Sequence, residues 1–314
     1  MHSLLSMLFQ DFPVPSARRP SACRISGCAA LLLAADSLAA QDRPLDRLAD
    51  EMEPTRTLVY KELGDRRLTL HLFEPEGHRS GDRRPVYLVI HGGGWTSRTP
   101  RYFYPFAKHF ADIGMLGISL EYRLLDKRLG TTVFDSVKDA RSAVRYLRAR
   151  ADELGIDPAR IVVAGGSAGG HLAAGTALFD GIEGTDEQRE GTGGGEPDAI
   201  PCRPDLLVLY YPVIDTSAAG YGQEKIGERW RDLSPVDQVK PSLPPTLLLH
   251  GTADTVTPFA GAERFHKLML AAGNEIEFLV HRDGRHGYFL FDLALFAVAM
   301  QQTEEFLGRH GMLP

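Results

Sequence analysis

A single serine lies among very small residues in the segment IVVAGGSAGGHLAAG, residues 161–175. Residues 165–169 satisfy the pattern G-x-S-x-G, with an apolar β-branched run before it and an alanine-rich run after it. A strand that turns abruptly into a helix strains the backbone at the turn, so the flanking positions must lack bulky side chains. The segment therefore predicts a strand, a sharp turn and a helix, with Ser167 projecting above a sheet as a nucleophile.

A phosphate-binding loop is the other reading of a glycine-rich turn. A P-loop needs Gly-Lys followed by Ser or Thr, and this segment lacks it. The dinucleotide pattern G-x-G-x-x-G is also not matched, because Ser167 and Ala168 fill its positions differently. We therefore favour the nucleophile.

A serine hydroxyl needs a general base, and the base needs a carboxylate to orient it. His286 follows the apolar run IEFLV, and Asp254 follows the apolar run TLLLHG. Two other acids compete for the carboxylate role, Asp215 after an earlier apolar run and Asp283 close to the histidine. The sequence RDG indicates that Asp283 is a turn residue, so Asp254 is the preferred partner.

The segment HGGGW, residues 91–95, offers hydrogen-bond donors for an oxyanion. Acyl transfer passes through a tetrahedral intermediate, and glycine amides approach such a group without steric hindrance. Gly93, Gly94 and the amide of Ala168 are the expected donors. His91 is then structural, and we expect it to hold the glycine loop by hydrogen bonding.

Aromatic residues near these motifs are candidates for lining a substrate site, although aromatics are more often plain core. Four of them are Trp95, Trp230, Tyr288 and Phe289. The remaining histidines and the three cysteines show no metal-ligand spacing. We therefore predict neither a metal nor a cofactor.

Elements that position these residues can be read from the apolar pattern. The segments RTLVYKEL and RLTLHLFEP read as a hairpin closed by Gly64 and Asp65. Six nearly continuous apolar runs then alternate with helical patterns. This alternation predicts an α/β fold with a mostly parallel eight-stranded sheet that is covered by helices on both faces. The later strands of this sheet are expected to be buried.

Some segments carry finer predictions. Residues 135–155 predict one amphipathic helix closed by Gly155, and Asp157 with Pro158 predicts a capped short turn after it. Residues 180–204 are glycine-rich and acidic, which predicts a flexible insertion. Residues 215–245 are expected to form a short lid over the sheet edge.

The first forty residues differ from the rest of the chain. Arginines precede the apolar run ISGCAALLLAA, and small residues suited to signal peptidase follow it. We read residues 1–40 as an export signal and residues 41–314 as one catalytic domain, exported to the periplasm or secreted. A disordered or partly helical tail on a cytoplasmic protein is the alternative. The apolar run follows Cys28 where a lipoprotein box requires the reverse, which excludes lipidation.

Composition limits the partners. The 314 residues are 43% hydrophobic and carry a formal net charge of −6, so no basic footprint suggests nucleic acid or an anionic membrane surface. No later apolar run approaches membrane-spanning length. The sequence does not indicate an oligomeric state.

With HGGGW, GGSAGG, GTADTVTP and RHGYF in this order, the chain resembles the serine esterases and lipases of the α/β-hydrolase superfamily. It is most similar to the hormone-sensitive-lipase-like and acetyl-xylan or feruloyl-esterase-like branches. The resemblance implies Ser167 as nucleophile with Asp254 and His286 as partners, and a structural role for EYRL at residues 121–124. The long helical N-terminal cap of the lipase branch is missing, which favours short acyl groups on a sugar or another bulky alcohol.

Other functions on the same fold stay open at this stage. A kynurenine-formamidase-like amidase shares the glycine loop with tryptophan and the same three catalytic residue types. A non-catalytic binding module is also known on this fold, and such modules tend to lose the histidine. We therefore expect a serine esterase whose partner is a small-molecule or carbohydrate ester.

Overall fold

The computed structural model describes residues 43–182 and 200–314. The predicted export signal lies outside the described residues, as does most of the predicted insertion at 180–204. The strands are β1 (Arg56–Leu63), β2 (Arg66–Phe73), β3 (Arg84–Ile90), β4 (Leu116–Leu120), β5 (Ile156–Gly166), β6 (Leu206–Tyr210), β7 (Thr246–Gly251) and β8 (Ile276–His281). The α-helices are α1 (Pro44–Asp50), α2 (Tyr104–Asp112), α3 (Val133–Ala149), α4 (Ala151–Leu154), α5 (Ala168–Leu178), α6 (Gln223–Ile226), α7 (Phe259–Ala271) and α8 (Leu293–Arg309). Short 3₁₀ turns include η1 (Pro100–Phe103), η4 (Trp230–Leu233), η5 (Pro235–Asp237) and η6 (Tyr288–Phe291).

The eight strands form one sheet in the order β1-β2-β4-β3-β5-β6-β7-β8. β1 and β2 pair antiparallel, β2 pairs antiparallel with β4, and all other neighbours are parallel. The predicted mostly parallel sheet and the hairpin at its edge are confirmed. At the hairpin turn Gly64 adopts a φ of 58°, a left-handed angle that suits glycine.

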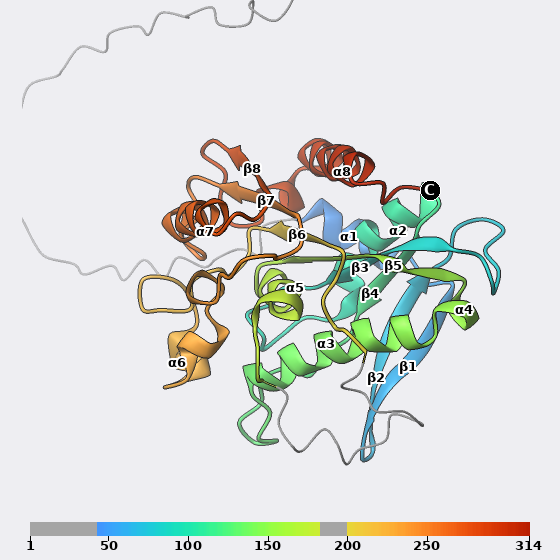
Figure 1. The fold of residues 1–314 in the computed structure, drawn as a ribbon, viewed down its shortest axis with the longest axis horizontal. Coiled ribbons are helices and arrows are strands. Elements are labelled where there is room, and N and C mark those ends of the chain that lie inside the picture. Colours follow the sequence, from blue (N-terminus) through green and yellow to red (C-terminus); the bar gives the residue numbers. More distant parts are fainter. Residues whose placement is uncertain (1–42, 183–199) are drawn as a thin grey trace, which may run out of the picture. The chain divides into compact units, whose positions relative to one another are not determined.

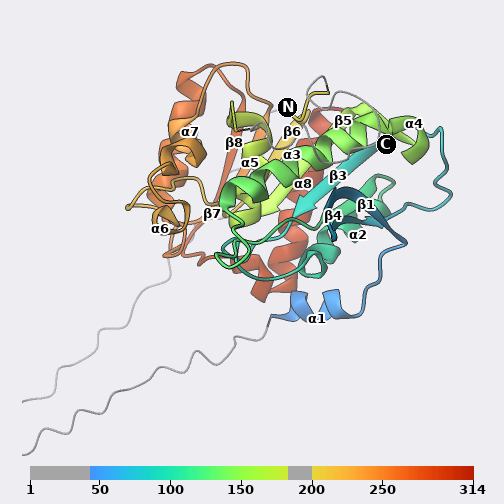
Figure 2. The ribbon, with the colours of Figure 1, turned by 90° about the horizontal axis from the view of Figure 1, so that it is seen from below.

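Helices cover both faces of the sheet, as predicted. Figure 1 shows α1, α2 and α8 on one face and α3, α4 and α5 on the other. In Figure 2 α3 and α5 lie side by side, and the two helices contact one another. Side chains alternate along the central strand, so that Leu88 of β3 joins the core on the α3 face while Tyr87 and Val89 join the core on the α8 face. The inner strands β3, β4, β6 and β7 are therefore buried on both faces.

Two predictions of local structure were wrong in part. The helix expected over 135–155 is two helices, because the backbone leaves the helical region at Arg150 and the bend lets both Ala151 and Leu154 enter the core. Gly155 ends the second helix in a left-handed conformation, as predicted. Asp157 caps no helix; it accepts the amide of Ala159 where β5 slips register against β3.

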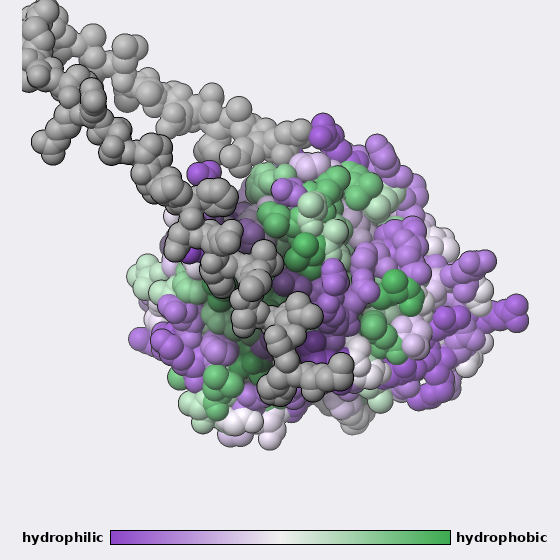
Figure 3. All heavy atoms as spheres, turned by 90° about the horizontal axis from the view of Figure 1, so that it is seen from above, coloured by the Kyte–Doolittle hydropathy of each residue, from purple (hydrophilic) through white to green (hydrophobic). Residues whose placement is uncertain are grey.

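The last strand is also less buried than predicted. β8 pairs only with β7, so it is an edge strand, and most of its side chains are partly exposed. Val280 is 50% exposed. Figure 3 shows apolar residues in separate groups among hydrophilic ones on the face seen from above. None of the helices in the described residues is long and apolar enough to cross a membrane.

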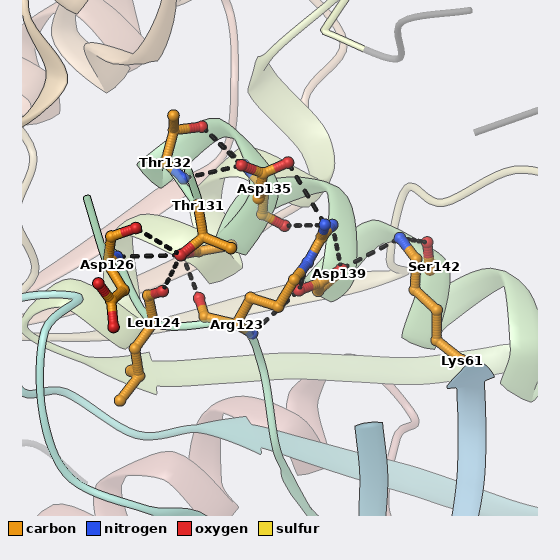
Figure 4. Close-up of polar contacts among 10 residues, drawn as sticks. Lys61, Arg123, Leu124, Asp126, Thr131, Thr132, Asp135, Asp139 and Ser142 are labelled. Carbon is orange, nitrogen blue, oxygen red and sulfur yellow. Dashed lines mark hydrogen bonds and ion pairs between the residues drawn. The ribbon is translucent and has the colours of Figure 1, made fainter. Parts of the chain in front are cut away.

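A buried polar network joins β1, the segment after β4 and α3 (Figure 4). The Asp139 carboxylate is fully buried, and it lies 3.0 Å from Lys61 Nζ and 2.7 Å from an Arg123 guanidinium nitrogen. The amide of Arg123 also donates to this carboxylate. The network therefore fixes the segment that follows β4 against α3.

Candidate active site

Ser167 occupies the sharp turn between β5 and α5, with φ 56° and ψ −122°. This conformation is strained for a residue with a side chain. A Cβ atom at Gly165 would lie 2.3 Å from the carbonyl oxygen of Gly169, and one at Gly169 would lie 2.1 Å from the carbonyl oxygen of Ile90. The glycines are thus required because β5, α5 and β3 meet in van der Waals contact here, which confirms the steric prediction.

The structure brings Ser167, His286 and Asp254 together. His286 lies in the turn after β8, and its Nε2 atom is 2.8 Å from Ser167 Oγ. Its Nδ1 atom is 2.8 Å from Oδ2 of Asp254, which lies in the turn after β7. The Asp254 carboxylate is buried, whereas the His286 ring remains 22% exposed. This arrangement allows the imidazole to take a proton from the serine hydroxyl.

The competing acids lie elsewhere. Asp215 accepts the amide of Ser217 and lies 3.8 Å from an Arg264 guanidinium nitrogen. The side chain of Asp283 is 89% exposed, next to Arg282. Among the described residues, Asp254 is the carboxylate in contact with His286.

Burial by itself would raise the pKa of Asp254, but its surroundings reverse that effect. The hydrogen bond and charge of His286, the amide of Thr257 and the nearby His250 together hold the pKa below its ordinary value. The carboxylate is therefore ionised at neutral pH and can orient and stabilise a protonated imidazole.

Thr257 was missed by the sequence analysis. Its hydroxyl is 2.9 Å from Asp254 Oδ2 and 3.2 Å from His286 Nδ1, and its amide donates to Asp254 Oδ1. His250 donates from Nε2 to the Thr257 carbonyl at 2.8 Å, which holds this turn. The sequence signal was available, because Thr257 lies three residues after Asp254, where a side chain can return to the carboxylate.

Tyr211 was also missed. It directly follows β6, and its ring stands edge-on to the His286 ring with centroids 5.0 Å apart. A Cβ atom at Gly166 would lie 2.6 Å from the Tyr211 hydroxyl oxygen. Tyr211 has a φ of 36°, which is unusual for a residue with a large side chain. It therefore packs against both the serine turn and the histidine.

The glycine loop lies directly beside Ser167. A Cβ atom at Gly92 would be 3.1 Å from Ser167 Cβ. Gly93 and Gly94 have φ of 116° and 60°, and within the described parts of the chain neither amide has a hydrogen-bond acceptor. Ala168 begins α5, so its amide has no acceptor inside the helix. The amides of Gly93, Gly94 and Ala168 are thus free to donate, and their role as oxyanion donors stays a prediction.

Contacts from several elements hold this loop. His91 Nδ1 lies 2.7 Å from the Gly92 carbonyl, which confirms the predicted structural role. The segment after β4 supports both ends, because the Tyr122 hydroxyl donates to the His91 carbonyl and the Leu125 amide donates to the Trp95 carbonyl at 2.7 Å. The EYRL segment therefore positions the oxyanion loop.

The predicted aromatic lining is wrong for two residues. Trp95 and Phe289 are both 0% exposed, because their large apolar rings pack into the core. Tyr288 is partly buried and stacks on His281 with ring centroids 4.2 Å apart. Trp230 is half-buried in η4, with Arg231 over its ring.

The described residues contain no group of three His, Cys, Asp or Glu side chains arranged to bind a metal ion. Cys202 is free and buried.

Residues 70–269, well over half of the chain, match the model of the BD-FAE family. The chain belongs to the BD-FAE family. A solved thermophilic esterase from Thermogutta terrifontis, Est2, is 33% identical, with a TM-score of 0.75 over 84% of this chain and 95% of that one. The predicted membership of the α/β-hydrolase serine esterases is confirmed.

Two curated relatives are longer than this chain. The probable carboxylic ester hydrolase LipM from Mycobacterium tuberculosis is 28% identical over 58% of this chain and 44% of its own length. Endo-1,4-beta-xylanase B from Butyrivibrio fibrisolvens is 28% identical over 62% of this chain and 32% of its own length. The chain thus spans less than half of either relative.

Proposed function

We propose that the protein is a serine carboxylic-ester hydrolase that works through an acyl-enzyme. The observation that carries this proposal is the unbroken contact from Ser167 Oγ through the His286 ring to Asp254, with 2.8 Å at each step. Serine is a weak nucleophile by itself, and a histidine base that is oriented by a carboxylate activates it.

The mechanism follows from the geometry. His286 Nε2 accepts the hydroxyl proton as Ser167 Oγ attacks the ester carbonyl carbon, and Asp254 stabilises the imidazolium. The amides of Gly93, Gly94 and Ala168 donate to the oxyanion that forms. Collapse of the tetrahedral intermediate breaks the ester bond, and the imidazolium gives its proton to the leaving alcohol. Water then repeats the same steps on the acyl-enzyme and releases the carboxylic acid.

The acyl group of the substrate is short in this proposal. A Cβ atom at Gly94 would lie 2.5 Å from the Tyr221 hydroxyl oxygen, and one at Gly222 would lie 2.5 Å from the Trp95 ring. Residues 215–245, the proposed lid, therefore pack closely on the oxyanion loop. Structures of Est2 with propionate and with butyrate bound are in keeping with small acyl groups.

The alcohol is a sugar or another bulky group in this proposal. The xylanase among the relatives associates this kind of domain with a polysaccharide-degrading protein. The arginines and the apolar run in residues 1–40 favour export, which would bring the enzyme to acetylated polysaccharides outside the cell.

Replacing Ser167 with alanine tests the proposed nucleophile. We expect kcat on 4-nitrophenyl acetate to fall at least ~10³-fold, because the attacking oxygen is lost while the fold is kept. The purified variant should retain the thermal unfolding midpoint of the wild type and should no longer react with a fluorophosphonate probe. Retention of most activity would exclude Ser167 as the nucleophile.

A panel of aryl esters from acetyl to lauroyl, with acetylated xylan and N-formylkynurenine, tests the substrate class. We expect acetyl to butyryl esters to be hydrolysed fastest and acetylated xylan to release acetate. A preference for lauroyl esters contradicts the short acyl group, and faster hydrolysis of N-formylkynurenine than of any ester contradicts the esterase proposal.

A further inference from the structure

Two arginines lie near the oxyanion loop and η6 in sequence or in space, and the proposed reaction uses neither. Arg98 lies four residues beyond Gly94, at the end of the oxyanion loop, and its guanidinium stacks over Tyr102 at 4.2 Å from the ring centroid. Arg43 immediately precedes α1, and its guanidinium lies 4.8 Å from the ring centroid of Phe291 in η6. Arg98 thus follows the oxyanion loop, and Arg43 contacts the 3₁₀ turn that begins two residues after His286.

Tyr211 packs against both η6 and the His286 ring. Its ring contacts the His286 ring, and a Cβ atom at Gly287 would lie 3.6 Å from the Tyr211 ring. Phe289 of η6 packs edge-on against the same Tyr211 ring with centroids 5.3 Å apart, and Phe291, under the Arg43 guanidinium, belongs to the same turn. In keeping with this arrangement, burial raises the pKa of Tyr211 and the charges of Arg98 and Arg43 oppose the rise.

The charge of this pair is not balanced. Arg98 has a carboxylate partner, because one of its guanidinium nitrogens lies 3.6 Å from Asp46 Oδ1. The Arg43 guanidinium makes no hydrogen bond or ion pair with any residue that the structure describes, although Arg43 is partly buried. Burial and the charge of Arg98 both lower the pKa of Arg43. One carboxylate thus faces two guanidinium groups. This local excess of positive charge contrasts with the formal net charge of the chain, which is −6.

A partly buried guanidinium with unused donors costs free energy unless something pairs with it. A carboxylate suits it, because the planar guanidinium donates two parallel hydrogen bonds to the two carboxylate oxygens. A neutral ester would leave the charge unpaired.

We propose that Arg43 and Arg98 form an anion subsite beside the active site, which binds a carboxylate carried by the ester substrate. The proposal rests on the esterase function proposed above and adds a substrate class to it. The carboxylate is part of either the acyl group or the alcohol, and paired substrates distinguish these two sources.

Two pairs of substrates measure the preference. For the acyl side, 4-nitrophenyl hemiglutarate is compared with 4-nitrophenyl valerate; for the alcohol side, 4-acetoxybenzoate is compared with its methyl ester. We expect kcat/KM of the wild type to be higher for the charged member of at least one pair, and the preference to shrink as salt is added.

Arg43→Met should lower the kcat/KM for that charged ester about tenfold, as expected for a charged hydrogen bond, and leave its neutral partner unchanged. Arg98→Met should act in the same direction, and Arg43→Lys should keep part of the preference. Arg282→Met is the matched control, because it removes one positive charge from a side chain that is 93% exposed. Thermal unfolding midpoints show whether each variant is folded.

The outcome separates this proposal from the proposed function. Turnover of the neutral esters without any preference for a charged one, or a preference that survives both methionine variants, overturns the anion subsite and leaves the esterase standing. Binding does not depend on turnover, so monomethyl glutarate and methyl butyrate are also titrated into Ser167→Ala by calorimetry. Tighter binding of monomethyl glutarate that is lost in Ser167→Ala/Arg43→Met supports the subsite even if no ester is hydrolysed; equal binding of the two overturns it.

Discussion

At the scale of single residues, the active site depends on small groups that hold the larger ones. The Thr257 hydroxyl and amide both contact the Asp254 carboxylate, and His250 holds the Thr257 carbonyl. These contacts leave the carboxylate one orientation, in which Oδ2 faces His286 Nδ1. Thr257 is therefore a positioning residue, because it touches the carboxylate and the imidazole ring but lies outside the path of the reacting atoms.

Replacing Thr257 with valine keeps the shape of the side chain and removes the hydroxyl. We expect kcat on 4-nitrophenyl acetate to fall about tenfold with little change in KM, since one hydrogen bond to a charged group is lost and substrate contacts are not. Thr257→Ser should restore kcat; an unchanged kcat in the valine variant would contradict the positioning role.

At the scale of elements, the segment after β4 couples the oxyanion loop to the rest of the fold. Tyr122 and Leu125 hold the two ends of the loop, and between them Arg123 is fixed to α3 by Asp139. Lys61 extends the same network to β1 at the far edge of the sheet. The loop beside Ser167 is thus supported by ion pairs that join β1, the segment after β4 and α3 (Figure 4).

Asp139→Asn should lower the free energy of unfolding by about 3–5 kcal/mol, because it removes a buried negative charge that Lys61 and Arg123 both contact. Urea denaturation followed by circular dichroism measures the effect. Asp112→Asn is the control: its ion pair with Lys108 is exposed at both ends, so the change should stay below about 1 kcal/mol. Equal effects of the two substitutions would show that the buried network contributes little stability.

At the scale of the whole molecule, two buried histidines link folding to pH. His91 and His171 are fully buried, and burial lowers the pKa of each to about 4. Each ring contacts one backbone carbonyl, that of Gly92 for His91 and that of Leu233 for His171, and the other ring nitrogen has no partner in the described residues. Both rings are therefore neutral in the folded protein.

The protein should lose stability as the pH falls from about 6.5 to 4. In that window the unfolded histidines bind protons and the folded ones do not, so each contributes a slope of about 1.4 kcal/mol per pH unit, with stability highest above the unfolded pKa. Urea denaturation at pH 7, 6 and 5 measures the slope. His171→Gln should reduce the slope by about 1.4 kcal/mol per pH unit, whereas His266→Gln, at a partly exposed position, should not; a flat wild-type profile would contradict the prediction.

Features that depend on neighbouring residues could be predicted from the sequence, whereas contacts between distant residues could not. Ser167 and its glycines were predictable because the steric demands of a strand-turn-helix junction act on neighbouring residues. The hairpin at Gly64 was predictable for the same reason. Trp95 and Phe289 were wrongly assigned to the substrate site because a sequence gives the type of an aromatic residue and not its neighbours.

The sequence by itself determined the sheet, the order of its elements and the residue types needed for acyl transfer, because hydrophobic periodicity and turn chemistry are local properties. Only the tertiary structure decided which residues meet. It placed Asp254, and neither Asp215 nor Asp283, against His286. It also brought Thr257 and Tyr211 to the same ring, and Arg98 to Asp46 of α1. These contacts join separate strands and loops, and their distances depend on strand register and side-chain packing, which no short stretch of sequence specifies.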